Sequence, residues 1–319
     1  MRFALSEDQS LLADAVGTAL NDACTPERVR ASWTEPSDDL WALLAELGVL
    51  GLTASEADGG MGMGAIEAAA ICRNAGYSGL PEPLAEHLAL LPLLSGTPYA
   101  HHMAGAIGGQ SRLTCAPKNA PVPHADRADL VARVDGPRVV VVESPECAPL
   151  RSVDGSRRLF SVRGTGAVLS ASGQRLHDHA AVYTAATLLG LAQRMLDLAV
   201  DYAKARRQFG KPIGTFQAVQ HHLANALMAL KFAQPAVLRA AWSLDHDHPE
   251  AELDVCAAKA LSSDAASEVA RAALQVHGAI GYTLECDLQL FHKRVLALRA
   301  AWGDADWHRD RAASLLHLP

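Results

Sequence analysis

Apolar residues recur at helical spacing along the first part of the chain. Ser6 followed by Gln9 has the pattern of a capping box, which marks the start of a helix. A second helix is predicted to start near Asp38 or Asp39 and to stop at Gly48, because glycine commonly follows the last helical residue. The apolar positions behind the first cap are Leu12, Ala15, Val16, Ala19 and Leu20.

The pattern then changes twice along the chain. Clustered glycines in residues 56–62 predict a loop, and an alanine-rich helix follows it to about Gly76. Between about residues 104 and 175 the composition shifts to Gly, Pro and Arg with short β-branched runs. Two of these runs, Val139–Val142 and Leu159–Val162, are typical of strands. We expect a small β-region in the middle of the chain.

From Ala180 onward the helical period returns and persists. A long helix is predicted from the apolar positions between residues 216 and 230. It continues to Pro235, where we expect a kink. Two further helices are predicted at about 250–275 and 285–301, and a short one from about Asp306. The order is therefore helical, strand-rich and helical again.

Composition narrows the functional class. The chain has 319 residues and a formal net charge of -7, with no basic stripe, so nucleic acid is not an expected partner. It contains no apolar run of about 20 residues and no signal-like segment after Met1, so we expect no membrane anchor and a cytoplasmic location. The cysteines lie far apart without a CxxC pair, which favours free thiols over disulfides or zinc. They are Cys24, Cys72, Cys115, Cys147, Cys256 and Cys286.

One basic motif spans Arg206–Gly214, where a long predicted helix ends. We expect Gly210 to follow the last helical turn and Pro212 to prevent the helix from continuing. A guanidinium such as that of Arg206 can hold a diphosphate through two parallel hydrogen bonds. A plain basic turn at a helix C-terminus explains the same residues, because positive charge is favoured there.

A second motif spans Gln275–Tyr282, where glycines at 278 and 281 flank an apolar pair. Such glycines let a ligand approach the backbone closely, although a packing turn explains them equally well. Gln217 could likewise be an ordinary surface amide. Each signal is weak by itself.

Taken together and in order, these segments resemble the acyl-CoA dehydrogenase family along almost the whole chain. The resemblance implies an N-terminal helical domain, a middle β-domain and a C-terminal four-helix bundle. It also implies FAD as the cofactor and the α,β-dehydrogenation of an acyl-CoA thioester. The matching segments are Trp41–Leu52, Asp58–Gly62, Arg206–Gln217 and Gln275–Glu285.

The resemblance implies domains at 1–103, 104–178 and 179–319, the fold being mostly α with a reduced β-domain. It also implies residues that reach the FAD of a neighbouring subunit. These residues are Arg206, Gln208, Phe209, Gln217, Gln275 and Gly278.

The catalytic base of that family is missing from its expected places. The family's Glu-Gly-Thr signature falls on Trp302-Gly303-Asp304, and an indole cannot accept the α-proton of the substrate. The alternative base position falls on Val200, whose neighbour Asp201 points about 100° away on a helix. Asp304 or Asp306 could serve as a substitute, but either is better explained as the N-cap of the helix that follows.

The middle region departs further from the family. It lacks counterparts of the Thr-Glu-Pro-x-Ala-Gly-Ser-Asp loop and the Trp-Ile-Thr-Asn strand that hold flavin and thioester. We interpret Asp126–Asp129 as a solvated turn. The pairs His101-His102 and His221-His222 diverge on a helix and lack a third ligand, so no metal site is expected.

Three hypotheses follow. In the first, the chain completes the FAD site of a longer partner that supplies the catalytic Glu, as in the α2β2 actinobacterial dehydrogenases of steroid side-chain CoA thioesters. In the second, it is a flavin-free assembly or binding protein with the dehydrogenase fold. In the third, it is an autonomous homodimeric enzyme that uses Asp304 or another acid as its base.

Overall fold

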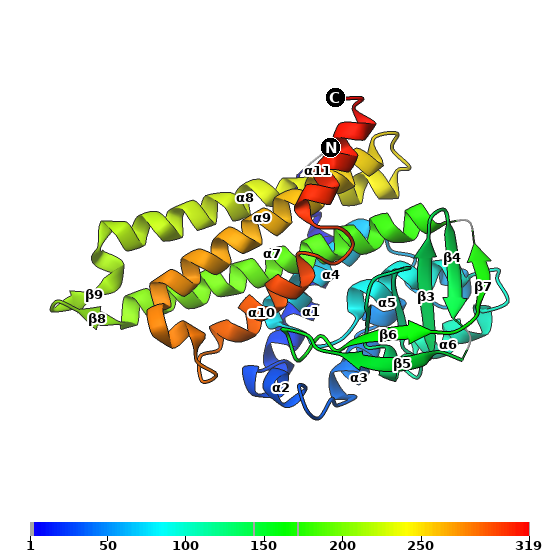
Figure 1. Ribbon diagram of the computed structural model, residues 1–319, viewed down its shortest axis with the longest axis horizontal. Helices are drawn as coiled ribbons and strands as arrows, with labels where there is room; N and C mark the ends of the chain where they lie inside the picture. The colour runs from blue at the N-terminus through cyan, green and yellow to red at the C-terminus, as the bar shows by residue number, and fades with distance from the viewer. Residues whose placement is uncertain (1–2, 143, 171, 319) are drawn as a thin grey trace.

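The structure is a computed structural model that describes residues 3–142, 144–170 and 172–318. Figure 1 shows a helical N-terminal region, a small β-region at one end and long helices that extend to the other end. The predicted mostly α fold with a small β-region is confirmed. Among the described residues, no helix is long and apolar enough to cross a membrane.

The N-terminal helices begin where the sequence signals placed them. The Ser6 side chain accepts a hydrogen bond from the Gln9 backbone N–H, and the Gln9 side chain returns one, so the capping box is confirmed. Gly48 has a φ of 72° after the third helix, which this residue tolerates because it lacks Cβ. The helices are α1 (Glu7–Ala23), α2 (Pro26–Ala31), α3 (Asp39–Glu46), α4 (Ala65–Ser78), α5 (Leu84–Leu90) and α6 (Met103–Ile107).

The middle region forms two small sheets. One has the strand order β1-β3-β4-β7, in which β1 and β3 are parallel, and the other has the order β2-β6-β5. Both predicted strands are confirmed, as β4 and β6. The strands are β1 (Leu113–Pro117), β2 (Val122–Pro123), β3 (Leu130–Asp135), β4 (Arg138–Val142), β5 (Glu146–Leu150), β6 (Leu159–Arg163) and β7 (Gly166–Ser170).

The C-terminal half is a bundle of long helices with one small hairpin. Helix α8 runs through Pro235, which removes the backbone N–H that would otherwise bond to the Lys231 carbonyl. The elements are α7 (Gly173–Ala205), β8 (Arg207–Gln208), β9 (Lys211–Pro212), α8 (Gln217–Asp245), α9 (Ala251–His277), α10 (Leu288–Leu298) and α11 (Ala305–Leu315).

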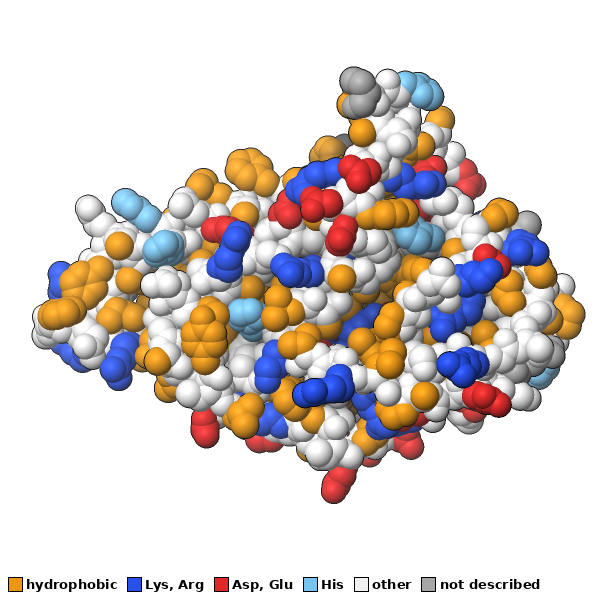
Figure 2. Space-filling model, in the orientation of Figure 1, with side chains coloured by type: hydrophobic (Ala, Val, Ile, Leu, Met, Phe, Trp, Pro, Cys, Tyr) orange, Lys and Arg blue, Asp and Glu red, His pale blue; other side chains and the backbone are white. Residues whose placement is uncertain are grey.

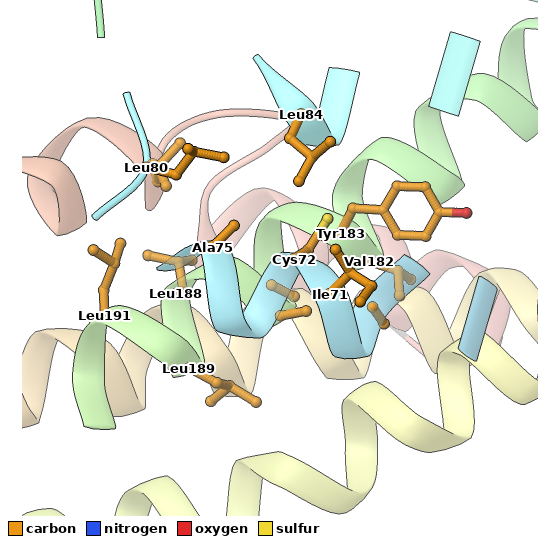
Figure 3. Close-up of a cluster of buried hydrophobic side chains, with 14 of the residues drawn as sticks. Ile71, Cys72, Ala75, Leu80, Leu84, Val182, Tyr183, Leu188, Leu189 and Leu191 are labelled. Carbon is orange, nitrogen blue, oxygen red and sulfur yellow. The ribbon is translucent and has the colours of Figure 1, made fainter. Parts of the chain in front are cut away.

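Helices α4 and α7 cross closely at the centre of the core. A Cβ at Gly190 would lie 1.9 Å from the Arg73 carbonyl oxygen, and one at Gly76 would lie 2.1 Å from the Thr187 carbonyl oxygen. Only glycine permits this approach, because any side chain there would push the two backbones apart. Figure 3 shows the apolar side chains of the two helices packed around this crossing.

A buried ionic network joins the three regions. Arg294 on α10 forms an ion pair with Asp154 in the segment after β5 and donates to the Leu80 carbonyl at 2.8 Å. In the same segment, Arg157 bonds to Glu86 on α5 at 3.0 Å. Both ion pairs are buried, so each charge depends on its partner.

The interpretation of residues 126–129 as a solvated turn is wrong for one of its side chains. Arg127 is only 16% exposed and bonds to Asp38 and to the Ser37 carbonyl. Asp129 accepts the Arg112 backbone N–H at 2.8 Å. The segment fastens the β-region to the N-terminal helices, which local polarity did not reveal.

His87 on α5 makes a second connection between the N-terminal helices and the β-region. Its side chain is fully buried, with Nε2 3.2 Å from the Leu50 carbonyl oxygen and Nδ1 accepting from the Leu113 N–H at 3.4 Å. Both contacts fit a neutral ring, and burial lowers the pKa of His87 to about 4.

We predict that acid destabilises the protein through this residue. Between an unfolded pKa of about 6.5 and the folded pKa of about 4, only the unfolded chain binds the proton, so stability falls as the pH falls from 6.5. The contribution of one such group reaches about 1.4 kcal/mol per pH unit. Urea unfolding from pH 7.5 to 5 should give a smaller pH slope for His87→Gln than for wild type.

His221→Gln is the matched control, since His221 is exposed on α8 and its surroundings change little on unfolding. Equal slopes for His87→Gln and wild type would show that His87 does not carry the effect.

Candidate functional site

The first predicted motif forms an exposed hairpin beyond α7. Strand β8 pairs with β9, and Phe209 and Gly210 between them have φ angles of 52° and 78°. Two consecutive positive φ angles are typical of the tight turn in a two-residue hairpin. The expectation that Gly210 ends a helix is therefore wrong, because α7 has already ended at Ala205. The hairpin holds the Phe209 ring 91% exposed.

The second motif lies where α9 ends. Gly278 has φ 66° and ψ -144°, a conformation that side chains disfavour, and no atom would lie within 4 Å of a Cβ built there. The backbone at Gly278 is thus open to an approaching group. The Tyr202 ring stacks on His277 with centroids 4.4 Å apart, which brings the end of α7 beside the end of α9. Figure 1 shows β8 and β9 at the left tip of the molecule.

The residues predicted to contact FAD are all exposed at this end of the bundle. Within the described part of the chain, no hydrogen bond or ion pair engages the side chains of four of them, which leaves their polar atoms free. These four are Arg206, Gln208, Gln217 and Gln275. Arg207, by contrast, donates to the Gly210 carbonyl at 3.0 Å and so supports the hairpin.

Trp302 lies in a buried turn between α10 and α11. Its side chain is 3% exposed, and its ring meets His177 edge-on with centroids 5.8 Å apart. Trp302 and Gly303 have φ angles of 59° and 93°, so the chain reverses sharply here. The indole fills this space with an apolar ring and offers no proton acceptor.

Asp304, the weak candidate for a substitute base, caps α11. Its side chain accepts the Trp307 backbone N–H at 2.8 Å, which confirms the N-cap interpretation. Asp306 forms an ion pair with Arg309 at 2.9 Å. Both carboxylates therefore have structural partners.

Lys259 on α9 holds the Trp302 turn through hydrogen bonds to its backbone, and we call this contact a clamp. Its ammonium donates to the Gly303 carbonyl at 2.7 Å, the Arg299 carbonyl at 3.0 Å and the Ser263 hydroxyl at 3.2 Å. Burial lowers the pKa of Lys259 to about 7, while the nearby Asp304 carboxylate raises it. Three acceptors around one ammonium favour the charged form, so we infer that Lys259 is protonated and holds the turn by these hydrogen bonds.

His308 on α11 holds the same turn from the other side. Its Nε2 donates to the Trp302 carbonyl at 2.9 Å, and Nδ1 has no partner among the described residues. Burial lowers the pKa of His308 to about 3, with a further lowering from Lys259, so the ring is neutral. Sequence reasoning missed both clamps. Lys259 could have been noticed as a single charge on an otherwise small and apolar helix face.

The space between α4, α5, α7 and α10 is nearly filled. The cavity there is about 30 Å³, which is room for no more than a few water molecules, and it is lined by Arg157, Glu86 and Arg294. The buried ionic network occupies this junction. An acyl chain does not fit into it.

Comparison with known proteins identifies the family. Residues 6–92 match the acyl-CoA dehydrogenase N-terminal domain, and residues 172–316 match the C-terminal domain. The chain belongs to the acyl-CoA dehydrogenase family. FAD is the cofactor of this family, and the predicted family membership and cofactor are both supported.

Relatives and solved structures agree with this assignment. The acyl-CoA dehydrogenase IpdE2 of Mycolicibacterium smegmatis is 33% identical over 300 residues, which cover 91% of this chain and 93% of IpdE2. The fold matches a Tcur3481–Tcur3483 steroid ACAD variant with TM-score 0.89, 24% identity and 98% of both chains covered. It also matches the ChsE4–ChsE5 complex of Mycobacterium tuberculosis with TM-score 0.87, 23% identity and 99% of both chains covered.

We predict that Lys259→Met loosens the Trp302 turn. The substitution keeps a long apolar side chain but leaves the partly buried Arg299 and Gly303 carbonyls without this donor, which costs about 1–3 kcal/mol. Unfolding free energy measured in urea should fall by this amount, and tryptophan emission should shift to the red as Trp302 gains contact with water.

Lys204→Met is the control, because the Lys204 side chain is 72% exposed and, among the residues the structure describes, forms an ion pair with Asp201 alone. If both variants were equally stable, the clamp would have no energetic role.

Proposed function

We propose that this chain is a subunit of an FAD-dependent acyl-CoA dehydrogenase and completes the FAD site of a longer partner that supplies the catalytic Glu. One contrast carries the proposal. The side chains of Arg206, Gln208, Gln217 and Gln275 are exposed and unengaged among the described residues, whereas a buried Trp302 stands where we expect the family's base. Groups that would bind cofactor are present, and the group that would remove the proton is absent.

The hairpin residues suit the phosphate end of FAD. The guanidinium of Arg206 can donate two parallel hydrogen bonds to a diphosphate, and the open backbone at Gly278 lets a planar group approach. The free amides of Gln208, Gln217 and Gln275 add donors and acceptors around it. When bound, FAD supplies the acceptor for the hydride that leaves the β-carbon of the thioester.

The surface around this site supports a partner subunit. Figure 2 shows hydrophobic side chains gathered at the left end of the molecule, over the β8–β9 hairpin. Large apolar side chains are exposed on the hairpin, along α8 and α9, and on the turn after α9. A soluble monomer usually exposes such residues singly, so a group of them indicates an interaction surface. They are Phe209, Leu227, Met228, Phe232, Leu261, Ile280, Tyr282 and Leu284.

The related structures favour a different chain as that partner. The two matched structures are named for pairs of proteins, Tcur3481–Tcur3483 and ChsE4–ChsE5, and the first is a steroid ACAD. We therefore propose an α2β2 assembly with a longer dehydrogenase subunit, acting on an acyl-CoA with a bulky, steroid-like acyl group. The junction of α4, α5, α7 and α10 is too small for an acyl chain, so we propose that the acyl group lies in the partner's pocket.

A flavin-free binding protein is the second candidate, and the reduced β-region is its support. The autonomous enzyme with Asp304 as base is the third candidate. The capping bond from the Trp307 N–H and the nearby charge of Lys259 both act on Asp304, which weighs against its use as a base.

The first test concerns FAD occupancy. We expect the complex with the longer partner to be yellow and Arg206→Ala to lower its FAD content at least about tenfold at limiting FAD, because a charge-assisted bidentate contact is lost. Absorbance at the flavin band and protein mass give the stoichiometry. Arg138→Ala is the control, since that side chain is 56% exposed on β4. Unchanged FAD content in Arg206→Ala would overturn the proposed role.

The second test separates the autonomous enzyme from the subunit. We expect Asp304→Asn to keep the activity of the complex, because asparagine also caps helices, and Asp304→Ala to lower stability by about 1 kcal/mol. Turnover assays of the complex and of the chain alone are the measurements. Activity by the chain alone that disappears in Asp304→Asn would support the autonomous enzyme instead.

A further inference from the structure

A groove of about 350 Å³ lies between α1, α4, α7 and α8, away from the hairpin end. Its volume is at the lower end of the range for small-molecule sites. Most of its lining is apolar and comes from four helices and the segment before α1. The apolar lining residues are Phe3, Ala4, Leu5, Ala13, Ala69, Ala70, Ala186, Leu189, Pro235, Val237 and Leu238.

The groove also carries hydrogen-bond donors without acceptors. Arg73 and Lys231 line it, and neither side chain has an ion pair or hydrogen bond within the described part of the chain. Gln234 also lines the groove, but its Nε2 is buried away from the groove surface and finds no acceptor among the described residues. Partial burial lowers the pKa of Arg73. Arg73 and Lys231 are both exposed, so their charges are available to an anionic ligand in the groove.

The helix register places these donors at one end. Asp245 near the end of α8 accepts from the Ile66 N–H at 3.1 Å at the start of α4, so the two helices run in opposite directions. Ala69 on α4 and Leu238 on α8 lie near this contact. Arg73 on α4 and Gln234 on α8 lie farther from it, at the other end of the groove.

The lining residues in and before α1 also change from apolar to polar along the groove. Gln9 bonds to Glu67 at 2.7 Å, and the Ala13 carbonyl accepts from Asn74 at 2.6 Å, so α1 runs parallel to α4. Phe3 and Leu5 therefore belong to the apolar end, and Asp14 to the polar end. The groove is amphipathic along its length.

We propose that this groove binds a monocarboxylate with an extended apolar chain. At the polar end, two cations, Arg73 and Lys231, face one carboxylate, Asp14, which leaves one net positive charge. A carboxylate would accept from Arg73 and Lys231, and its chain would lie along the alanine-lined wall of α4. This site is separate from the proposed FAD site and goes beyond the proposed function.

Calorimetry with decanoate tests the proposal. The full-length chain should bind decanoate at least about tenfold more tightly than decanol, and Arg73→Met should remove this preference, because the charged hydrogen bond is worth about 1.5–3 kcal/mol. Ala70→Phe should weaken both ligands by filling the groove. Arg138→Met removes an exposed arginine from β4 and should leave binding unchanged.

Two outcomes would overturn the site: no decanoate binding by the wild type, or equal affinity in wild type and Arg73→Met when circular dichroism shows both folded. Photolabelling with a diazirine analogue of decanoate should mark peptides that contain residues 69–74 or 231–238. The same titration on the complex with the longer partner should give the same affinity. Loss of binding in the complex would show that a protein surface covers the groove, which contradicts a ligand site. FAD content is measured separately and does not depend on these results.

Discussion

Arg294 and its partners determine how the three regions of this protein fit together. One guanidinium on α10 bonds to the segment after β5 and to the carbonyl of Leu80, and Arg157 from that segment reaches Glu86 on α5. Removing one partner of such a buried pair costs about 3–5 kcal/mol, because the other charge stays in a medium that cannot solvate it. The β-region is thereby anchored against both helical regions.

The same anchoring explains why the junction of α4, α5, α7 and α10 has so little internal space. The segment that carries Asp154 and Arg157 fills this junction, and only about 30 Å³ remains. The Trp302 turn is filled by an indole and held by Lys259 and His308. In both places, side chains that stabilise the fold fill the interior. The exposed hairpin is the contrasting region, because its polar side chains face outward.

Much of the fold was predictable because its signals are local. The Ser6 capping box, the left-handed Gly48 and the Asp304 cap each follow from neighbouring residues, and each is confirmed. The role of Gly210 was predicted wrongly, because a glycine two residues before a proline suits a helix end and a hairpin turn alike. The clamp formed by Lys259, the burial of Arg127 and the Arg294 network depend on residues far apart in sequence. No local pattern encodes these contacts. For the candidate site, the sequence predicted which residues contact FAD and which base is missing, and both stay predictions, whereas the free state of the Arg206 and Gln275 side chains required the structure.

The exposed hairpin tip also bears on how the chain persists in a cell. A Phe209 ring that is 91% exposed, beside a long apolar stretch of α8, is a surface that chaperones and proteases recognise on unassembled proteins. If the proposed partner covers the hairpin, an unassembled copy would be removed faster than an assembled one. The level of this chain would then follow the supply of that partner, without matched rates of synthesis.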